Sequence, residues 1–244
     1  MAIRVWSDLG DPLQAERLLS DLIDLSKRPD LENVSPSSES YALVIRAWLA
    51  VADIGSQEAL VKASNWLRTV VERERDDEQV ALSQIEFYSG ILGAARKCAA
   101  QCPDVLDIAV ETFDMLRDSH HAIHPIHFSR LLQVGLLAMS RPENNEVRTA
   151  FVKEVAQECC EDGYLSSSFL QALANGPVYY DGWTIEESLR LENLLFPDWP
   201  LPASWSRNVK ESAYLPKRSD FLRTIYNLSH HGVDPYRRKH EKVE

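Results

Sequence analysis

The feature that most constrains the fold of this 244-residue chain is an internal repeat. The stretch IRVW at residues 3–6 returns as IRAW at residues 45–48, an offset of 42 residues. Tyr41, Tyr88 and Phe128 each stand just inside the start of a predicted helix, at spacings of 47 and 40 residues. A period of this length is typical of helical repeats, in which each unit stacks on its neighbours to bury its apolar face.

A second helix follows in each unit, because apolar residues recur there at the three-to-four spacing of one helix face. The four stripes are Ala15, Leu18, Leu22 and Leu25; Ala59, Ala63, Trp66 and Val70; Leu106, Ala109, Phe113 and Leu116; Val147, Phe151, Val155 and Cys159. The connections contain breakers: Asp11-Pro12, the serine-rich run 35–40, Pro103-Asp104 and Arg141-Pro142. No β-type alternation competes with this helical pattern.

The sequence therefore predicts an all-α protein, an α-solenoid of about four helix-turn-helix repeats followed by an irregular C-terminal tail. The repeat array covers residues 1–175, with helix pairs at about 1–27, 40–75, 85–118 and 126–162, a capping helix at 164–175, and an extension with a basic tail at 176–244. Residues matching 40–44 have almost no counterpart before Ile3. We therefore expect that the first helix begins partway through its repeat and that the chain derives from a longer array.

Composition excludes several classes of protein. The longest apolar stretch, residues 41–52, is interrupted by Arg46, whereas a helix that spans a membrane needs roughly 20 apolar residues. Residues 1–15 resemble neither a signal peptide nor an arginine-rich transit peptide, so the compartment is unknown from the sequence. The vicinal pair Cys159-Cys160 makes a poor disulfide framework and favours a reducing compartment.

Several residues match the repeat unit of one known family. Val34-Ser35-Pro36 followed by Ser40-Tyr41 fits a V-x-P-D turn and a T-Y-N helix start, and the stretch AVETFDML at 109–116 fits an A-x-x-x-F second helix. The chain resembles the pentatricopeptide-repeat proteins, above all the divergent ones of diatom-type algae. Those end in a Cys-Cys helix, a short helix and a tail LPxxWSRNV, here Cys159-Cys160, 166–173 and 201–209.

The resemblance covers about residues 1–210 and is imperfect. The units are longer than the usual repeat of the family, and the unit of Tyr88 lacks the preceding proline. The tetratricopeptide repeat is a rival, but its W-x2-L-G-x2-Y pattern is absent from this chain.

The resemblance implies binding of single-stranded RNA in a mitochondrion or plastid, in RNA processing, stability or translation. In the family, the residue after the helix aromatic reads a base together with the last residue of the preceding turn. Carried over, these residues are Ala42, Ser89 and Ser129 with Ser37, Gln84 and Ile126. Such short or apolar side chains offer few hydrogen bonds, so no RNA sequence can be deduced.

Charge is distributed unevenly along the chain. The net charge is −11, yet residues 201–244 hold nine basic and five acidic side chains. The first-helix segments are positive by a small margin, and their cations Arg46, Arg96, Lys97 and Arg130 are candidates to contact the RNA backbone. The alternatives are a solvated helix surface on these four residues and, for the whole chain, a scaffold of the tetratricopeptide kind that binds proteins and not RNA.

The remaining clusters predict no chemistry. The histidines His120, His121, His124 and His127 straddle Pro125 without a cysteine, so we expect a polar loop and no zinc site. Cys98 and Cys102 are expected to be buried helix cysteines. Because no nucleophile elbow, phosphate loop, dinucleotide motif or HExxH is present, we expect neither an enzyme nor a cofactor.

Aromatic residues gather after the last predicted repeat. They are Tyr179, Tyr180, Trp183, Phe196, Trp199 and Trp205. Two interpretations remain open: a tail that packs over the end of the helix array, or a surface that binds a protein partner.

Overall fold

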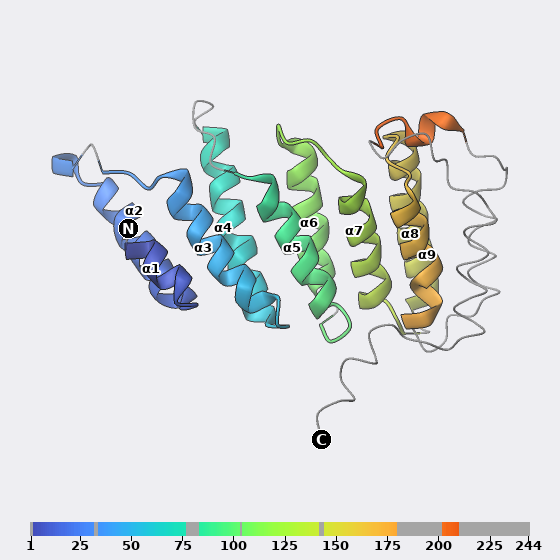
Figure 1. Cartoon of the computed structure of the whole chain (residues 1–244), viewed down its shortest axis with the longest axis horizontal. Helices are drawn as coiled ribbons and strands as arrows, with labels where there is room; N and C mark the ends of the chain where they lie inside the picture. Colours follow the sequence, from blue (N-terminus) through green and yellow to red (C-terminus); the bar gives the residue numbers. More distant parts are fainter. Residues whose placement is uncertain are drawn as a thin grey trace, which may run out of the picture. The chain divides into compact units, whose positions relative to one another are not determined.

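The computed structural model describes residues 2–31, 34–76, 83–102, 104–141, 144–179 and 202–209, with the backbone alone for 174–179. Within these ranges the regular elements are helices and no strand occurs, which confirms the predicted all-α class (Figure 1). The α-helices are α1 Ala2–Asp8, α2 Pro12–Ser26, α3 Ser38–Ala52, α4 Gln57–Asp76, α5 Ile85–Cys98, α6 Val105–Asp118, α7 Pro125–Ala138, α8 Asn145–Glu161 and α9 Ser167–Tyr179. The described residues also include the 3-10 helices η1 Pro29–Leu31 and η3 Ala203–Ser206.

The chain forms two compact units, residues 1–123 and 124–244. In unit 1 the helices pack as the pairs α1/α2, α3/α4 and α5/α6 (Figure 1). The first helices of successive pairs contact one another, α1 with α3 and α3 with α5, and α4 contacts α6 on the opposite side. We call α1, α3 and α5 the first-helix layer, and α2, α4 and α6 the second-helix layer.

Local sequence signals set the starts of these helices. The Asp11 carboxylate accepts a hydrogen bond from the backbone N–H of Gln14 at 3.1 Å, and Pro12 occupies the first turn of α2. The Ser37 hydroxyl caps α3 by accepting from the N–H of Ser40 at 3.3 Å. The turn between α3 and α4 contains Gly55 at φ +98°, a left-handed conformation that glycine adopts without strain.

The repeated aromatic residues form the centre of the core. Tyr41, Tyr88 and Phe128 are all fully buried on the first turns of α3, α5 and α7. Their side chains therefore anchor helix packing in both units. Burying an aromatic side chain of this size contributes roughly 1.5–3 kcal/mol relative to leaving it exposed.

The predicted apolar stripes are correct in the middle of the chain and wrong in two places. Val147, assigned to the core, is 63% exposed, and Leu25 is also exposed. Arg148, which follows Val147 in the chain, is buried instead. Its guanidinium donates to the carbonyl of Met139 at 3.1 Å and to Asn145 Oδ1 at 2.9 Å. A cation that satisfies carbonyls at the C-terminal end of α7 displaces the aliphatic residue from this position.

Unit 2 is built around α7, which contacts both α8 and α9. At Gly135 of α7 an added Cβ would lie 2.0 Å from Cε1 of Phe151 on α8, so the Phe151 ring occupies the space above this glycine.

The four cysteines are free thiols, and burial raises the pKa of Cys160 to about 12. The Cys160 thiol therefore stays protonated at neutral pH.

The 202–209 segment packs against the end of α8. The backbone N–H of Leu165 donates to the carbonyl of Trp205 at 2.8 Å, and the Asn208 N–H donates to Gly163 at 2.9 Å. The side chains of Arg207 and Asn208 donate to the carbonyls of Glu161 and Asp162 at the C-terminus of α8. The tail motif WSRNV therefore supplies hydrogen-bond donors to the C-terminal end of α8, where helix carbonyls have no donor in the next turn.

Two further predictions concern the C-terminal part. A helix is present where the capping helix was predicted at 164–175, and this helix, α9, runs from Ser167 to Tyr179. Most of the predicted irregular extension, and most of its aromatic residues, lie outside the described residues. Among the helices that the structure does describe, none is both long and apolar enough to cross a membrane.

Candidate nucleic-acid interface

The first-helix layer of unit 1 carries a small charged cluster centred on Glu39 of α3. The Glu39 carboxylate pairs with Arg4 of α1 at 3.0 Å and with Arg46 of its own helix at 3.5 Å. All three side chains are about half-exposed or more. The predicted RNA-contacting cation Arg46 therefore already has an acidic partner on the same surface.

Lys97 of α5 is paired in the same way. Its Nζ lies 2.9 Å from the Asp53 carboxylate, in the turn that follows α3, and both side chains remain accessible to solvent. The neighbouring Arg96 is half-buried and has interactions of its own. Sequence reasoning identified the cations and missed both acids. The seven-residue spacing of Glu39 and Arg46, two helix turns, was a usable signal, whereas the pairing of Lys97 with Asp53 depends on helix packing.

The predicted base-reading positions of unit 1 do not form a continuous polar row. Ala42 is fully buried, because α1 packs on α3 at this level and Ser7 donates to the carbonyl of the adjacent Leu43 at 3.1 Å. Its assignment to a base-facing surface is corrected. Ser89 and Gln84 are half-buried, and the Ser37 hydroxyl is engaged in capping α3.

Helices α3 and α5, which carry these predicted positions of unit 1, are in direct contact. A Cβ added at Gly90 of α5 would stand 2.6 Å from Cδ1 of Leu49 on α3. Because the small residue allows this approach, Arg46 and Lys97 are carried by two neighbouring helices of one layer.

In unit 2 the two predicted base-facing residues differ in their exposure to solvent. Ile126 is exposed, but Ser129 is buried: its hydroxyl donates to the Pro125 carbonyl at 3.1 Å and lies 3.2 Å from the hydroxyl of Ser168 on α9. The assignment of Ser129 as base-facing is corrected for this reason. Arg130 is half-buried and has partners within the protein.

The histidine cluster serves the fold of each unit. Nδ1 of buried His127 accepts a hydrogen bond from the backbone N–H of His124 at 3.0 Å, which caps the N-terminus of α7. Burial, with smaller effects from His124 and Arg130, lowers the pKa of His127 to about 4. In unit 1, Nε2 of His121 lies 3.1 Å from the Ser83 hydroxyl. Among the described residues, no group of three or more histidine, cysteine or acidic side chains is placed to hold a metal ion.

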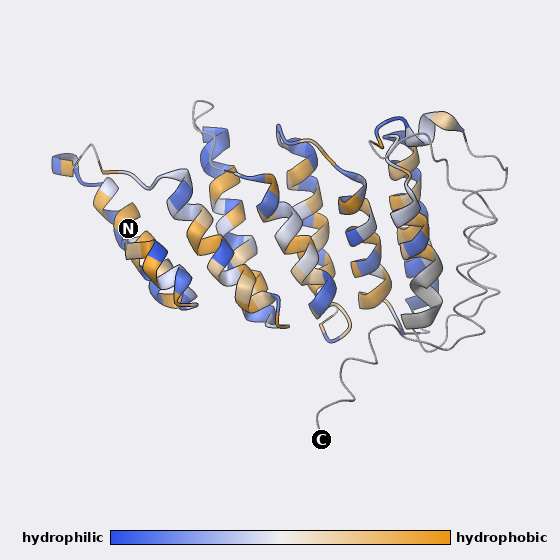
Figure 2. Cartoon of the chain, viewed as in Figure 1, coloured by the Kyte–Doolittle hydropathy of each residue, from blue (hydrophilic) through white to orange (hydrophobic). Residues whose placement is uncertain are grey.

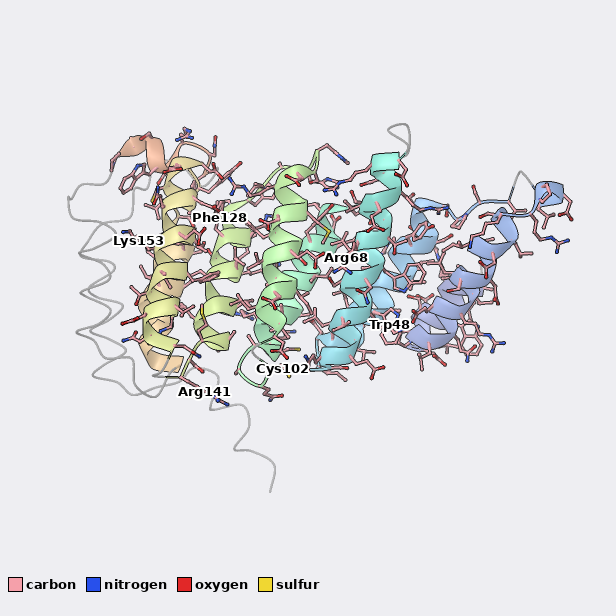
Figure 3. All side chains as sticks on the ribbon, turned by 180° about the vertical axis from the view of Figure 1, so that it is seen from behind. Trp48, Arg68, Cys102, Phe128, Arg141 and Lys153 are labelled. Atoms are coloured by element: carbon pink, nitrogen blue, oxygen red, sulfur yellow. The ribbon has the colours of Figure 1, made fainter. Side chains whose placement is uncertain are left out.

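The second-helix layer has a different electrostatic character. Three cations of α4 face acids on both neighbouring helices: Lys62 pairs with Glu16 at 3.1 Å, Arg68 with Glu111 at 2.6 Å and Arg75 with Asp118 at 3.5 Å. Figure 3 views the unit from this side and labels Arg68. The second helices carry eleven acidic and six basic residues, whereas the first helices carry three acidic and four basic. The acid of unit 1 is therefore concentrated in the second-helix layer.

Comparison of the chain with family models, with curated proteins and with solved structures finds no match. A functional assignment rests on the residues and contacts described above.

Proposed function

We propose that this chain is a pentatricopeptide-type α-solenoid that binds single-stranded RNA in an organelle, along the first-helix layer of unit 1. The observation that carries the proposal is the division of charge between the two layers. A phosphate backbone is repelled by the acidic second helices and meets a slightly positive surface on the first helices.

The ion pairs of Arg46 and Lys97 do not prevent such binding. Exposed pairs of this kind contribute only about 0–1 kcal/mol, so exchanging a carboxylate for a phosphate costs little. Because Ala42 and Ser129 are buried, the proposed contacts involve the RNA backbone and leave little base selectivity.

The rival function is a protein-binding scaffold. It is favoured by the acids Glu39 and Asp53, which make the first-helix layer nearly neutral and would disfavour phosphate beside them. A mixed-charge surface suits a polar protein segment, since protein interfaces have polar rims with paired charges.

Fluorescence anisotropy with a labelled single-stranded oligoribonucleotide of mixed sequence separates the two functions. Binding should weaken with added salt, and the double variant Arg46→Gln/Lys97→Gln should reduce the slope of log affinity against log salt by about 1.4 for two lost phosphate contacts. The matched control, Lys27→Gln/Lys153→Gln, removes two exposed cations outside the first-helix layer and should leave the slope unchanged. Absence of binding at low salt would favour the scaffold, and an equal loss in both variants would remove the assignment to this layer.

A further inference from the structure

The outer face of α2 is exposed and unusually apolar for the terminal helix pair of a stacked unit. Helix α2 packs against α1, α3 and η1, and its Glu16 is joined to Lys62 of α4 by an ion pair. On its remaining face Leu13 is 63% exposed and Leu25 is 39% exposed, with the exposed side chains of Arg17 and Asp21 between them. Terminal repeats usually present a polar outer face, because no neighbour covers them.

The adjoining helix extends the apolar surface. Val5 of α1 is 51% exposed, and Leu9 in the turn between α1 and α2 is 67% exposed. Figure 2 shows apolar residues distributed along this helix pair. Exposed apolar area of this kind favours association with a partner that removes it from water.

The charged residues between the two leucines are available to a partner. Neither Arg17 nor Asp21 takes part in an ion pair within the described part of the chain, in contrast to Lys27 and Asp24 nearby, which pair at 2.8 Å. The four residues stand at intervals of four, so they form one of the ridges through which helices pack together.

This ridge is complementary to itself. Read along the helix its order is leucine, arginine, aspartate, leucine. If a second copy lies antiparallel, with a two-fold axis between positions 17 and 21, Leu13 faces Leu25 of the other copy and Arg17 faces its Asp21. The symmetry repeats both contacts, which is the defining property of an isologous interface. A parallel arrangement would bring the two arginines together and the two aspartates together.

We propose that α2 is the interface of a homodimer, in which two copies of this chain pack antiparallel through Leu13, Arg17, Asp21 and Leu25. Val5 and Leu9 are further exposed apolar residues of the same helix pair. The partner that covers this face is a second copy of the chain, because the ridge supplies both members of each pair, leucine with leucine and arginine with aspartate. Dimerisation requires no RNA.

Sedimentation equilibrium of the full chain over a range of concentrations tests the dimer. The wild-type chain should shift from monomer to dimer mass as concentration rises. Leu13→Glu should raise the dissociation constant at least tenfold, because it places a carboxylate against Leu25 of the partner. Val147→Glu changes an equally exposed apolar residue in unit 2 and should leave the dissociation constant unchanged. Circular dichroism of each variant verifies that the helices persist.

Charge reversal identifies the antiparallel register. Arg17→Asp and Asp21→Arg should each weaken the dimer, and the double variant Arg17→Asp/Asp21→Arg should restore it, because the exchanged charges again face each other across the two-fold axis. A wild-type chain that stays monomeric up to its solubility limit would overturn the proposal. So would a dimer that Leu13→Glu leaves intact, or a double variant that is no tighter than either single reversal.

Discussion

Arg68 of α4 holds Glu111 of α6 through two parallel hydrogen bonds, Nε to Oε1 at 2.7 Å and Nη2 to Oε2 at 2.6 Å. This bidentate contact joins the second helices of two successive pairs. It also lowers the pKa of Glu111, first through the hydrogen bonds from Arg68 and then through the positive charge.

Removing this pair should loosen the packing of α4 on α6. Both side chains are 42% exposed, so solvent screening limits the coupling energy in a double-mutant cycle of Arg68→Ala and Glu111→Ala to roughly 0.5–1 kcal/mol. The cycle is measured by urea denaturation. The Arg75–Asp118 pair, longer at 3.5 Å and more exposed, is the matched control and should give a coupling near zero. Equal coupling in both pairs would contradict the importance of the bidentate geometry.

Gly135→Ala should destabilise unit 2. The new methyl group would collide with the Phe151 ring, and overpacking of this kind typically costs about 1–3 kcal/mol. Thermal denaturation measures the loss. Phe151→Leu shortens the opposing side chain. Gly135→Ala should therefore cost less stability in the Phe151→Leu background than in the wild type. A fully additive double variant would show that the glycine does not serve this contact.

Stability should decrease below neutral pH through His127. Its folded pKa of about 4 lies below the usual 6.5, so as pH falls the unfolded chain takes up the proton first. The contribution is complete above about pH 6.5 and is lost progressively toward pH 4, by roughly 1–3 kcal/mol.

Urea denaturation at several pH values measures this effect. His127→Asn keeps an acceptor for the His124 N–H but cannot titrate. The stability of the wild type relative to the variant should therefore fall between pH 7 and pH 4.5. A constant difference across this range would contradict the linkage.

Loss of the C-terminal cap should expose the end of α8. In Arg207→Ala/Asn208→Ala, the carbonyls of Glu161 and Asp162 lose their donors, and the contact between Leu165 and Trp205 loses its support. Hydrogen exchange of the Leu165 amide should accelerate by about tenfold or more, equivalent to about 1.4 kcal/mol. Amides of α3 are the internal control. Unchanged exchange at Leu165 would show that the segment holds α8 without these two side chains.

The sequence by itself determined the all-α class and the aromatic core. Apolar periodicity, the breakers between helices and the caps at Asp11 and Ser37 are local signals, which act within one helix or one turn. The repeated Tyr41 and Tyr88 were found because the same packing problem recurs in successive helix pairs. The predicted RNA function and its compartment came from family resemblance and remain a proposal.

Only the tertiary structure decided which side chains are available to a partner. Ala42 is buried by the neighbouring helix α1, and Arg148 replaces Val147 in the core because its guanidinium reaches the carbonyls at the end of α7. Lys97 on α5 pairs with Asp53 in the turn after α3, so this contact joins two successive helix pairs. Each outcome depends on a residue contributed by another helix. Helical periodicity specifies the buried face of a helix to within about one residue, and the atoms of the neighbouring helix decide the rest.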